Sequence, residues 1–311
     1  VRFEHSIFSA QLEKIRSFYG LGPGDVDQPG FPLFALFSTA LGAHAVIPDM
    51  DPTKPAQVDP RRFVDSIQHY QVTYSFGSPA IWQVVSRYCS QNNIRCKSLK
   101  KVLMAGAPVS GALVEQVFDI IAEDGEIHTP YGATESLPIV SIEGRTIVDE
   151  TWPETKKGKG TCVGSAVPGV SIKIIKPTDS LLPTIDECTI LEPGSCGEII
   201  VKGDVVTRAY DGNEAQTRAS KIKDDDGFWH RIGDVGYLDT QDRLWFCGRK
   251  AHRVFSRKGT MYTICCEALV NNHPDVFRSA LVGIDSGQEY QTAVMIIELH
   301  KQVTRKVEDV V

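Results

Sequence analysis

The spacing of apolar residues changes along the chain, and the change predicts two kinds of structure. In the first half, apolar positions recur every three or four residues, which is the period of an amphipathic helix. This spacing predicts helices over residues 5–19 and from residue 79 to about residue 88. Beyond residue 161 the period becomes two, as in residues 170–175, which is typical of short strands separated by Gly and Pro turns. We therefore expect an α/β part followed by a mostly β part.

Local signals add detail to the helical half. The apolar face of the first helix is expected to carry Ile7, Phe8, Leu12, Ile15 and Phe18 or Tyr19. Ser78 is the expected N-cap of the second helix and Pro79 its first residue, because Pro needs no donor there. The longest apolar stretch, residues 31–48, is interrupted by Ser, Thr and His, so it is too broken to span a membrane. We expect it to form buried core or the wall of a pocket.

A strand–helix–strand unit lies at the centre of this half. The pattern predicts a strand over residues 101–105, then a helix with apolar residues at spacings of three and four, then a strand that ends near residue 130. Small or polar residues follow both strands, at positions 106–108 and 131–135. In open α/β sheets, ligands bind at the carboxyl ends of the strands. The unit therefore places these two segments at the expected ligand edge.

The residue types in these segments suit a nucleotide. Gly106 and Ala107 have little or no side chain, so the backbone there can approach a flat base closely. Tyr131 offers an aromatic face for stacking, and Gly132 permits a turn that other residues resist. Considered alone, the same segments are equally consistent with plain solvent-exposed turns.

Thr134 and Glu135 add groups that bind phosphate and metal. The Thr134 hydroxyl can donate a hydrogen bond to a phosphate oxygen. Glu135 supplies a hard oxygen of the kind that Mg²⁺ uses beside phosphates. A match of this length is a hypothesis that the rest of the chain must support.

Composition narrows the class of protein. The chain has 311 residues, of which 42% are hydrophobic and 23% charged, as is ordinary for a globular protein with more than one domain. Its net charge of −6, without a basic run, argues against nucleic-acid binding. The eight cysteines form no Cys-x-x-Cys pair, so we expect reduced thiols in a cytoplasmic protein. The first residue is Val rather than Met, so we expect a fragment.

Four motifs, taken in order, resemble the adenylate-forming superfamily of acyl-CoA synthetases, peptide-synthetase adenylation domains and luciferases. The first is Tyr-Gly-Ala-Thr-Glu at residues 131–135, with Ala-Gly-Ala-Pro shortly upstream. The second is Gly-Glu-x-x-Val-Lys-Gly at residues 197–203. The third is Gly-Asp at residues 233–234, where this chain has Ile232 at a position that family members fill with Thr. The fourth is Gly-Arg-Lys at residues 248–250, and the four together are far more specific than any one.

The resemblance implies an α/β fold with several parts. These are a layered sheet-and-helix subdomain, a small β-barrel-like subdomain and the start of a small mobile α+β C-terminal domain. We expect a large AMP-binding domain over residues 1–249, with its α/β part at 1–150 and its mostly β part at 151–249. The small domain would occupy residues 250–311, and both domains would be incomplete.

The resemblance also implies roles for particular residues. Thr134, Glu135 and Arg249 are the expected catalytic residues: Thr134 would hold a phosphate oxygen and Glu135 would hold Mg²⁺. Asp234 would bind both ribose hydroxyls of ATP or AMP, with Arg249 reaching the ribose and phosphates. The remaining nucleotide contacts would come from Gly106, Ala107, Pro108, Tyr131 and Gly132. The expected acyl pocket includes Phe34, Phe37, Ser78 and Pro79.

The implied reaction is ATP-dependent adenylation of a long-chain fatty carboxylate. Residues 131–144 and 248–254 further resemble the β-lactone synthetases of bacterial olefin biosynthesis, which would close a β-hydroxy fatty acid to a β-lactone. One alternative is a fatty acyl-CoA ligase, which would pass the acyl group to CoA. Assembly with other enzymes of the same pathway is a further expectation.

Two features of the family are missing from this chain. The Gly/Ser/Thr-rich phosphate loop would precede the first helix, and the C-terminal catalytic lysine would lie beyond residue 311. We therefore expect the chain to bind AMP or ATP but to be nearly inactive in adenylation. The second alternative is accordingly a nucleotide-binding protein without catalysis.

Overall fold

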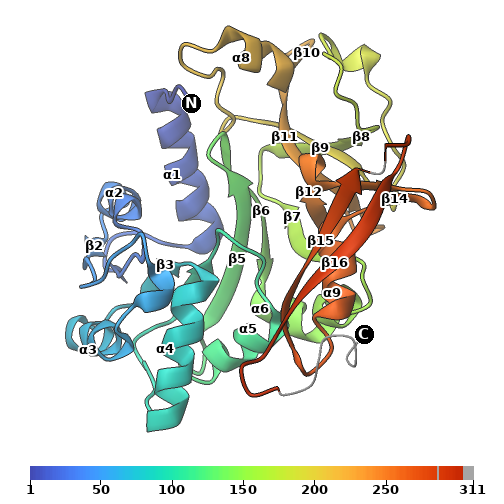
Figure 1. Cartoon of the computed structure of the whole chain (residues 1–311). Helices are drawn as coiled ribbons and strands as arrows, with labels where there is room; N and C mark the ends of the chain where they lie inside the picture. Colours follow the sequence, from blue (N-terminus) through green and yellow to red (C-terminus); the bar gives the residue numbers. More distant parts are fainter. Residues whose placement is uncertain (286, 304–311) are drawn as a thin grey trace. The chain divides into compact units, whose positions relative to one another are not determined.

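The computed structural model describes residues 1–285 and 287–303, and the chain divides into two compact units (Figure 1). Unit 1 comprises Val1–Glu150, Val163–Val170 and Gly203–Thr207. Unit 2 comprises Thr151–Cys162, Ser171–Lys202 and Arg208–Val311. Each unit holds a buried apolar cluster of its own.

Unit 1 is a layered α/β structure built on a mainly parallel sheet. Its strand order is β2-β1-β3-β4-β5-β6-β7, parallel from β2 to β5 and antiparallel from β5 onward. The strands are β1 Val26–Asp27, β2 His44–Ala45, β3 Tyr74–Gly77, β4 Lys101–Met104, β5 Glu126–Ala133, β6 Ser136–Glu143 and β7 Thr161–Ala166. The helices are α1 His5–Tyr19, η1 Pro32–Phe34, α2 Ala35–Ala40, η2 Pro55–Gln57, α3 Pro60–Tyr70, α4 Pro79–Asn92, α5 Gly111–Phe118, α6 Gly144–Thr146 and η3 Ile147–Thr151. The predicted strand–helix–strand unit is confirmed as β4, α5 and β5.

Helix α1 has the predicted bounds and packs its predicted apolar face, with Ile7 and Tyr19 buried and Leu12 and Ile15 against the core. The polar residues Gln11 and Lys14 are buried, whereas Phe18 is 37% exposed. Nε2 of Gln11 donates a hydrogen bond to the carbonyl of Leu137 at 3.0 Å, and Nζ of Lys14 pairs with Asp204 at 2.8 Å. Tyr19 rather than Phe18 thus belongs to the buried face. The burial of Gln11 and Lys14 was not predicted, because the groups that satisfy these side chains are distant in the sequence.

Helix α4 begins where Ser78 and Pro79 predict, but the expected capping bond is absent. Among the described residues, the buried hydroxyl of Ser78 has no hydrogen-bond partner. The amide of Ile81 instead donates to the carbonyl of Ser78 at 3.1 Å. The helix continues to Asn92, beyond its predicted end near residue 88. The start is confirmed because Pro fits the first helical position, while the capping role of the Ser78 side chain is wrong.

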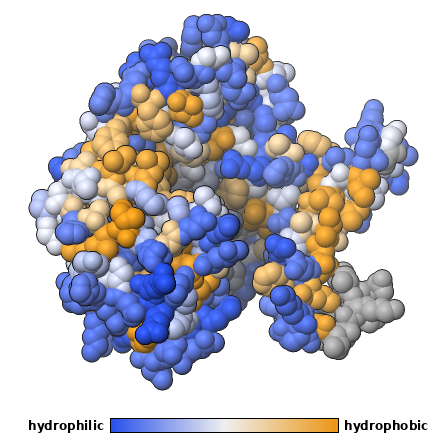
Figure 2. All heavy atoms as spheres, turned by 60° about the vertical axis from the view of Figure 1, so that its left-hand side comes forward, coloured by the Kyte–Doolittle hydropathy of each residue, from blue (hydrophilic) through white to orange (hydrophobic). Residues whose placement is uncertain are grey.

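The apolar segment at residues 31–48 is only partly buried. Leu33 and Leu36 are 70% and 56% exposed, while Phe34 and Phe37 are half-buried. Residues three apart share one face of the helical path through η1 and α2, so the two pairs point to different sides. Apolar side chains also reach the surface on the face that Figure 2 brings forward. The expectation of buried core or pocket wall is therefore confirmed only in part: Phe34, Phe37, Ser38 and Leu41 line a cavity, whereas Leu33 and Leu36 are exposed.

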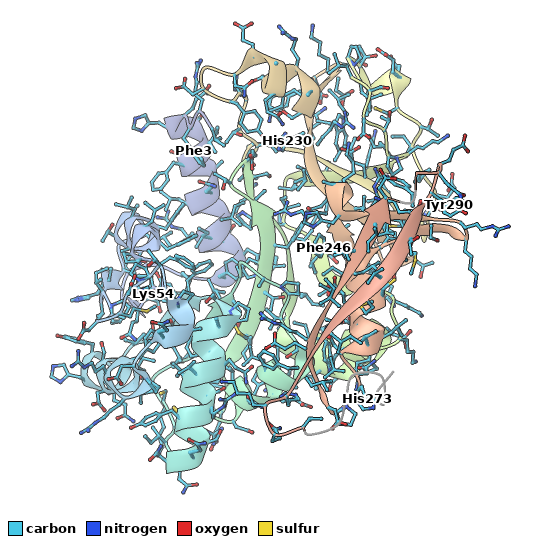
Figure 3. The ribbon with its side chains drawn as sticks, in the orientation of Figure 1. Phe3, Lys54, His230, Phe246, His273 and Tyr290 are labelled. Carbon is cyan, nitrogen blue, oxygen red and sulfur yellow. The ribbon has the colours of Figure 1, made fainter. Side chains whose placement is uncertain are left out.

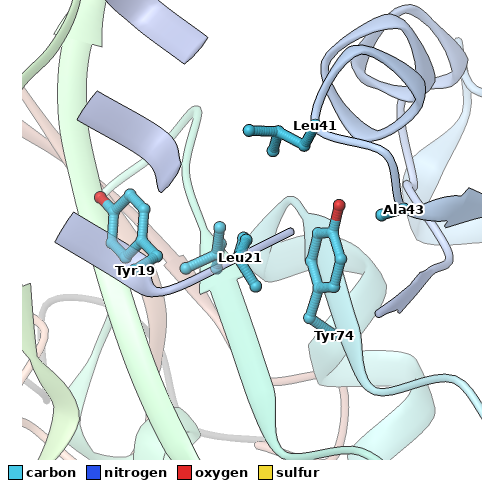
Figure 4. Close-up of a cluster of buried hydrophobic side chains, with 6 residues drawn as sticks. Tyr19, Leu21, Leu41, Ala43 and Tyr74 are labelled. Atoms are coloured by element: carbon cyan, nitrogen blue, oxygen red, sulfur yellow. The ribbon is translucent and has the colours of Figure 1, made fainter. Parts of the chain in front are cut away.

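The core of unit 1 beside this segment is a cluster of buried side chains (Figure 4). Its members are Tyr19, Leu21, Leu41, Ala43, Tyr74 and Leu103. Burying one large apolar side chain of this kind contributes roughly 1.5–3 kcal/mol. The cluster packs the end of α1 against β3 and β4, so it holds this helix on the sheet.

Unit 2 is mostly β. Its main sheet has the order β12-β11-β9-β8, with β10 paired to β11. Its elements up to residue 249 are α7 Trp152–Thr155, β8 Val170–Ile175, η4 Ile185–Glu187, β9 Gly197–Gly203, α8 Glu214–Ser220, β10 Lys221–Asp224, β11 Gly227–Leu238 and β12 Leu244–Arg249. The later elements are η5 Lys250–His252, β13 Val254–Ser256, β14 Gly259–Met261, α9 Thr263–Val270, β15 Val276–Asp285 and β16 Gln291–Leu299. β13 pairs with β14, and β15 pairs with β16.

The period-two pattern predicted these strands well. β8 and β9 have the bounds that the alternation at residues 170–175 and the glycines at 197 and 203 indicate. The buried cluster of this sheet consists of Ile175, Ile200, Ile222 and Trp229. The expected domain division at residue 250 stays a prediction, because unit 2 contains residues on both sides of it.

All eight cysteines are free thiols, four of them buried and four half-buried. In residues 1–285 and 287–303, no helix is long and apolar enough to cross a membrane. The same residues include no group of three His, Cys, Asp or Glu side chains that could hold a metal ion by themselves.

Candidate functional site

Residues 106–108 lie just beyond the carboxyl end of β4, which is parallel to β5. Gly106 has a φ of 95°, in the left-handed region that favours glycine. Among the described atoms, none lies within 4 Å of the position that a Cβ at Gly106 would take. Ala107 and Pro108 are exposed. The backbone here is open to a flat ligand, which is the geometry that the predicted adenine contact requires.

Thr134 and Glu135 form the turn of the β5–β6 hairpin. β5 continues through Ala133, so this strand is longer than predicted, and Ala133 pairs with Ser136 across the turn. The carbonyl of Glu135 accepts a hydrogen bond from the amide of Thr207 at 2.8 Å. Thr134 is exposed and Glu135 is half-buried. The turn thus presents a hydroxyl and a carboxylate. Its backbone is held by the pairing of Ala133 with Ser136 and by the hydrogen bond from Thr207.

Gly132 is needed for a close approach rather than for a turn. A Cβ at this position would lie 2.5 Å from the carbonyl oxygen of Ser136 and 2.8 Å from Cδ1 of Leu137. The pairing register of the hairpin shifts between Tyr131 and Ala133, which marks a bulge. A side chain at Gly132 would push β6 away from β5, so the predicted turn role is wrong although the glycine is required.

In unit 2, Asp234 and Arg249 form an ion pair. Asp234 on β11 lies directly opposite Arg249 on β12, and Nη1 of Arg249 donates to Oδ1 of Asp234 at 2.9 Å. Asp234 is 3% exposed, whereas the side chain of Arg249 is 58% exposed. Gly233, with a φ of 80°, turns β11 just before Asp234. A carboxylate offers about four acceptor positions, so Asp234 can accept from hydroxyls in addition to Arg249.

A buried ionic network beside this pair was not predicted from the sequence. Arg231 donates to both carboxylate oxygens of Glu198, at 2.9 and 2.8 Å. Nζ of Lys250 lies 3.4 Å from the same carboxylate. Glu198 on β9 is opposite Val235, the neighbour of Asp234 on β11. The network therefore joins β9 to β11, the strand that carries Asp234. In the sequence, Glu198 stood out only as part of the motif at residues 197–203.

His230 lies next to Arg231 on β11 (Figure 3). It is 1% exposed, and burial lowers the pKa of its imidazole to about 3. Its Nδ1 lies 3.3 Å from the carbonyl oxygen of Ser220. A histidine that stays neutral at physiological pH has no charge to offer to phosphates, so we assign His230 to the core.

Unit 1 contains a cavity of about 50 Å³ with mainly apolar walls. Phe34 and Phe37 line it, and their ring centroids lie 5.7 Å apart. Phe76 stacks on Phe34 at 4.0 Å. Ser78 and Pro79 are not among its lining residues. The structure thus brings together two of the four residues predicted for an acyl pocket, and their role stays a prediction.

Asp27 also lines this cavity and was not predicted from the sequence. It is 1% exposed, and the hydroxyl of Ser38 donates to its Oδ2. Among the described residues, Oδ1 of Asp27 has no hydrogen-bond partner. Burial raises the pKa of this carboxyl to about 7, against the opposing effects of Ser38 and of the nearby amides of Phe76 and Gln28. The sequence feature that could have indicated Asp27 is an acidic residue in a short strand between apolar segments.

Within each unit, the structure groups the predicted nucleotide residues. In unit 1, positions 106–108 and 131–135 lie at the ends of the neighbouring strands β4 and β5. In unit 2, Asp234 and Arg249 are paired. Unit 1 therefore presents open backbone, a hydroxyl and a carboxylate, and unit 2 presents a buried acceptor with an exposed cation.

Comparison with known proteins bears on this arrangement. A family model described as "AMP-binding enzyme" matches residues 30–211. The match includes the β4–β5 strand ends and the hairpin turn at Thr134 and Glu135. It ends before Asp234 and Arg249.

Two relatives named "Olefin beta-lactone synthetase" match nearly the whole chain. The one from Xanthomonas campestris is 42% identical over 308 residues, covering 97% of this chain and 54% of the relative. The one from Stenotrophomonas maltophilia is 42% identical over 304 residues, covering 96% and 54%. An acyl-CoA ligase from Ajellomyces capsulatus is 26% identical, covering 81% of this chain and 41% of that ligase. The chain thus spans about half the length of the curated relatives that it matches.

Solved structures share the fold. An amide bond synthetase from Marinactinospora thermotolerans aligns with a TM-score of 0.78 at 21% identity, covering 98% of this chain and 57% of that structure. The O-succinylbenzoate coenzyme A synthetase of Bacillus subtilis, in complex with AMP, aligns with a TM-score of 0.78 at 22% identity, covering 100% and 58%. At these identities the likeness establishes the fold alone, and it confirms the predicted fold class.

Proposed function

Because this chain belongs to the AMP-binding enzyme family, we propose that the protein forms an acyl adenylate from ATP and a fatty carboxylate. The observation that carries the proposal is the anchored turn at Thr134 and Glu135 beside the open backbone of residues 106–108. The open backbone would accommodate a flat base, and the hydroxyl of Thr134 and the carboxylate of Glu135 would serve its phosphates and their metal ion. The match of the family model to the same segment supports the assignment.

In the proposed reaction, a carboxylate oxygen of the fatty acid attacks the α-phosphorus of ATP. The bond from this phosphorus to the bridging oxygen breaks, and pyrophosphate leaves with the electron pair. The exposed hydroxyl of Thr134 would donate a hydrogen bond to an α-phosphate oxygen. Such a reaction depends mainly on positioning and on stabilising the charge that develops on phosphate oxygens.

The remaining contacts would position the nucleoside. Asp234 would accept hydrogen bonds from the ribose hydroxyls beside its ion pair with Arg249. The exposed guanidinium of Arg249 would stabilise phosphate charge as well. Adenine would lie against the backbone of residues 106–108 and the ring of Tyr131.

Glu135 fits the ligand that Mg²⁺ requires. Its side chain is a carboxylate at a turn that the amide of Thr207 holds in place. Mg²⁺ is commonly held by one or two carboxylates together with substrate phosphates and water. When bound, the ion would supply charge neutralisation at the phosphates, and the role of Glu135 is to hold it there.

The finer proposal is that the acid carries a β-hydroxyl and that the product is a β-lactone. The two relatives at 42% identity, both named olefin β-lactone synthetases, support it. The substrate's own hydroxyl oxygen would attack the acyl carbonyl and lose its proton to solvent, and AMP would leave with the electrons of the broken acyl–phosphate bond. The internal hydroxyl needs neither a second substrate nor a binding site for one, so only its orientation toward the carbonyl must be held.

Transfer of the acyl group to CoA is the alternative. It is favoured by the similarity to a protein named as an acyl-CoA ligase, although at a lower identity of 26%. A CoA thiol would then replace the internal hydroxyl as the nucleophile. A nucleotide-binding protein without turnover is the remaining alternative.

One assay separates these three functions. The full-length protein is incubated with ATP and Mg²⁺ and with either a plain fatty acid or its β-hydroxy analogue, with and without CoA. Lactone from the hydroxy acid without CoA supports the proposal. Acyl-CoA from the plain acid, without lactone from the hydroxy acid, establishes the ligase. AMP binding with no pyrophosphate release from either acid establishes a binding protein.

A further inference from the structure

Two polar side chains, Gln11 and Lys14, lie on the buried face of α1. This helix packs against β6, the strand that follows the turn at Thr134 and Glu135 (Figure 1). Burying a charged or polar side chain costs free energy unless the side chain is paired. Apolar residues could pack this face of the helix without that cost. The two side chains therefore require an explanation beyond packing, and their partners supply it.

The ammonium of Lys14 joins α1 to two segments from much later in the chain. Its Nζ pairs with Oδ1 of Asp204 at 2.8 Å and donates to the carbonyl of Pro168 at 2.8 Å. A Cβ at Gly169 would lie 3.0 Å from this Nζ, and the φ of Gly169 is 81°, so a glycine here leaves room for the ammonium. The segments Val163–Val170 and Gly203–Thr207 both belong to unit 1. Lys14 thus fixes each of them to the first helix.

The segment that begins at Gly203 leads directly to the candidate metal site. Val206 forms a β-bridge with Ser136, the residue after Glu135. The amide of Thr207 then donates to the carbonyl of Glu135 at 2.8 Å. Val206 and Thr207 are both buried, so this short stretch has little freedom to move independently. A displacement of Asp204 would therefore shift the hydrogen bond that holds the backbone of Glu135.

Gln11 contacts the other side of the same turn. Its Nε2 donates to the carbonyl of Leu137 at 3.0 Å, and Leu137 lies on β6 two positions after Glu135. Buried carbonyls in proteins are almost always paired, and here the partner comes from the same helix as Lys14. One helix therefore holds the backbone on both sides of the turn through two separate polar contacts.

We propose that Lys14 is a positioning residue for the turn, acting through Asp204 and Thr207 on the carboxylate of Glu135. The inference rests on the proposed function for what that carboxylate holds, which is Mg²⁺ beside the phosphates of ATP. Lys14 touches neither the ion nor the nucleotide in this proposal. Groups that orient a metal ligand from outside the coordination sphere typically change metal affinity by about 10–100-fold when they are removed.

The test removes the ammonium in Lys14→Met, which keeps a long side chain. Asp204 is left without its partner, but its side chain is 58% exposed and remains solvated. Replacing a buried charge with an apolar side chain of similar size is often neutral for stability, so the variant should fold. Hydrogen exchange of the Thr207 amide is followed by NMR on the full-length protein. We expect exchange to be roughly five- to tenfold faster, as when a local opening becomes easier by about one hydrogen bond.

The second readout is metal affinity, with Mn²⁺ as the paramagnetic probe in place of Mg²⁺. Electron paramagnetic resonance measures the dissociation constant of Mn²⁺ from the complex of the full-length protein with ATP. In Lys14→Met this constant should rise roughly tenfold, the lower end of the range for groups outside the coordination sphere. Added Mg²⁺ should restore carboxylate-dependent pyrophosphate release by the variant, whereas a general folding defect would not respond to the metal.

Two further variants and a set of reference amides serve as controls. Arg16→Met removes a cation from the exposed side of the same helix and should change neither readout. The amides of β3 and β4 should exchange at the wild-type rate in Lys14→Met, which separates a local change from a global one. Adding Asp204→Ala to Lys14→Met should raise the Mn²⁺ dissociation constant no further, because the two residues act as one unit. Additive effects, or wild-type exchange of the Thr207 amide in Lys14→Met, would overturn the proposal.

The positioning role and the proposed function can fail separately. If the wild type binds no Mn²⁺ in the presence of ATP, the proposed metal site is wrong, and the Thr207 amide still decides whether Lys14 holds the turn. If wild type and Lys14→Met bind Mn²⁺ equally tightly, the positioning role alone is wrong.

Discussion

Asp27 in unit 1 and Glu198 in unit 2 are both carboxylates that are 1% exposed, but their partners differ. Asp27 accepts from the neutral hydroxyl of Ser38, and burial raises its pKa. Glu198 accepts two hydrogen bonds from Arg231 and lies near the ammonium of Lys250. Two equally buried carboxylates thus differ in what offsets their loss of water: a neutral hydroxyl for Asp27, and opposite charges at hydrogen-bond distance for Glu198.

The difference corresponds to what each region provides. The carboxylate of Asp27 lies in the wall of a mainly apolar cavity, and its Oδ1 has no hydrogen-bond partner among the described residues. Glu198 and Arg231 instead join β9 to β11, the strand that carries Asp234. The carboxylate of unit 1 thus borders a cavity, whereas that of unit 2 ties two strands together.

Breaking the Glu198 network should have the largest effect. In Glu198→Gln the buried guanidinium of Arg231 loses its charge partner, so we expect the free energy of unfolding to fall by roughly 3–5 kcal/mol. Urea denaturation followed by circular dichroism measures the loss. Glu192→Gln, at an exposed position, is the control and should change stability by less than about 0.5 kcal/mol. A loss near the control value would show that the network contributes little.

Asp27→Asn should have an effect that depends on pH. The folded protein holds the Asp27 proton up to about pH 7, whereas the ordinary pKa of the group is 3.8, so the folded state binds more protons between these values. Stability contributed by this group therefore falls as the pH rises through that window. The variant cannot titrate, so its stability relative to wild type should rise by roughly 3–4 kcal/mol from about pH 4 to about pH 8.

The neighbours of Asp27 define the control for this measurement. Asp25 carries a like charge that raises the pKa of Asp27 further, and burial raises the pKa of the adjacent Tyr74. Urea denaturation is repeated across the pH range for wild type, Asp27→Asn and the exposed Asp65→Asn. The difference between wild type and Asp65→Asn should not follow the same curve. Parallel curves for wild type and Asp27→Asn would contradict the raised pKa.

Asp234→Ala tests the nucleotide role of unit 2. Removing the buried acceptor should weaken AMP binding by roughly 1.5–3 kcal/mol, the value of hydrogen bonds to a charged group. Calorimetric titration of AMP measures the change, with the exposed Asp225→Ala as the matched control. Equal AMP affinity in wild type and Asp234→Ala would remove the ribose role of Asp234.

Arg249→Met should have the smallest effect on stability. The Arg249 side chain is 58% exposed, so its ion pair with Asp234 is largely solvated. We expect the free energy of unfolding to change by about 0–1 kcal/mol, well below the change in Glu198→Gln. A loss as large as that of Glu198→Gln would mean that the exposed pair, too, is structural.

Local patterns predicted the elements of the fold more reliably than their partners. The three- and four-residue spacing located α1 at its observed bounds, and the flanking glycines located β9. The same spacing did not reveal that Gln11 and Lys14 are buried, because their partners Leu137 and Asp204 lie far away in the sequence. The spacing of apolar residues shows which side chains share a face of a helix. Tertiary packing decides which other segments contact that face.

The candidate site divides in the same way. Residues 106–108 and 131–135 could be placed at strand ends from the sequence, because the alternation of strand and helix fixes where each strand stops. Asp27, in contrast, appeared only in the structure, since the cavity arises from rings on η1, α2 and β3. The pairing of Glu198 with Arg231 also appeared only there, because it joins residues on two strands that are adjacent through folding.

The sequence by itself determined the order of helices and strands, the family and the chemical types at the strand ends. These depend on the period of apolar residues and on short motifs, both of which are local. Only the tertiary structure decided which polar groups are buried, which of them have partners and where a cavity remains. Those properties follow from contacts between segments far apart in the chain, and such contacts leave no period in the sequence.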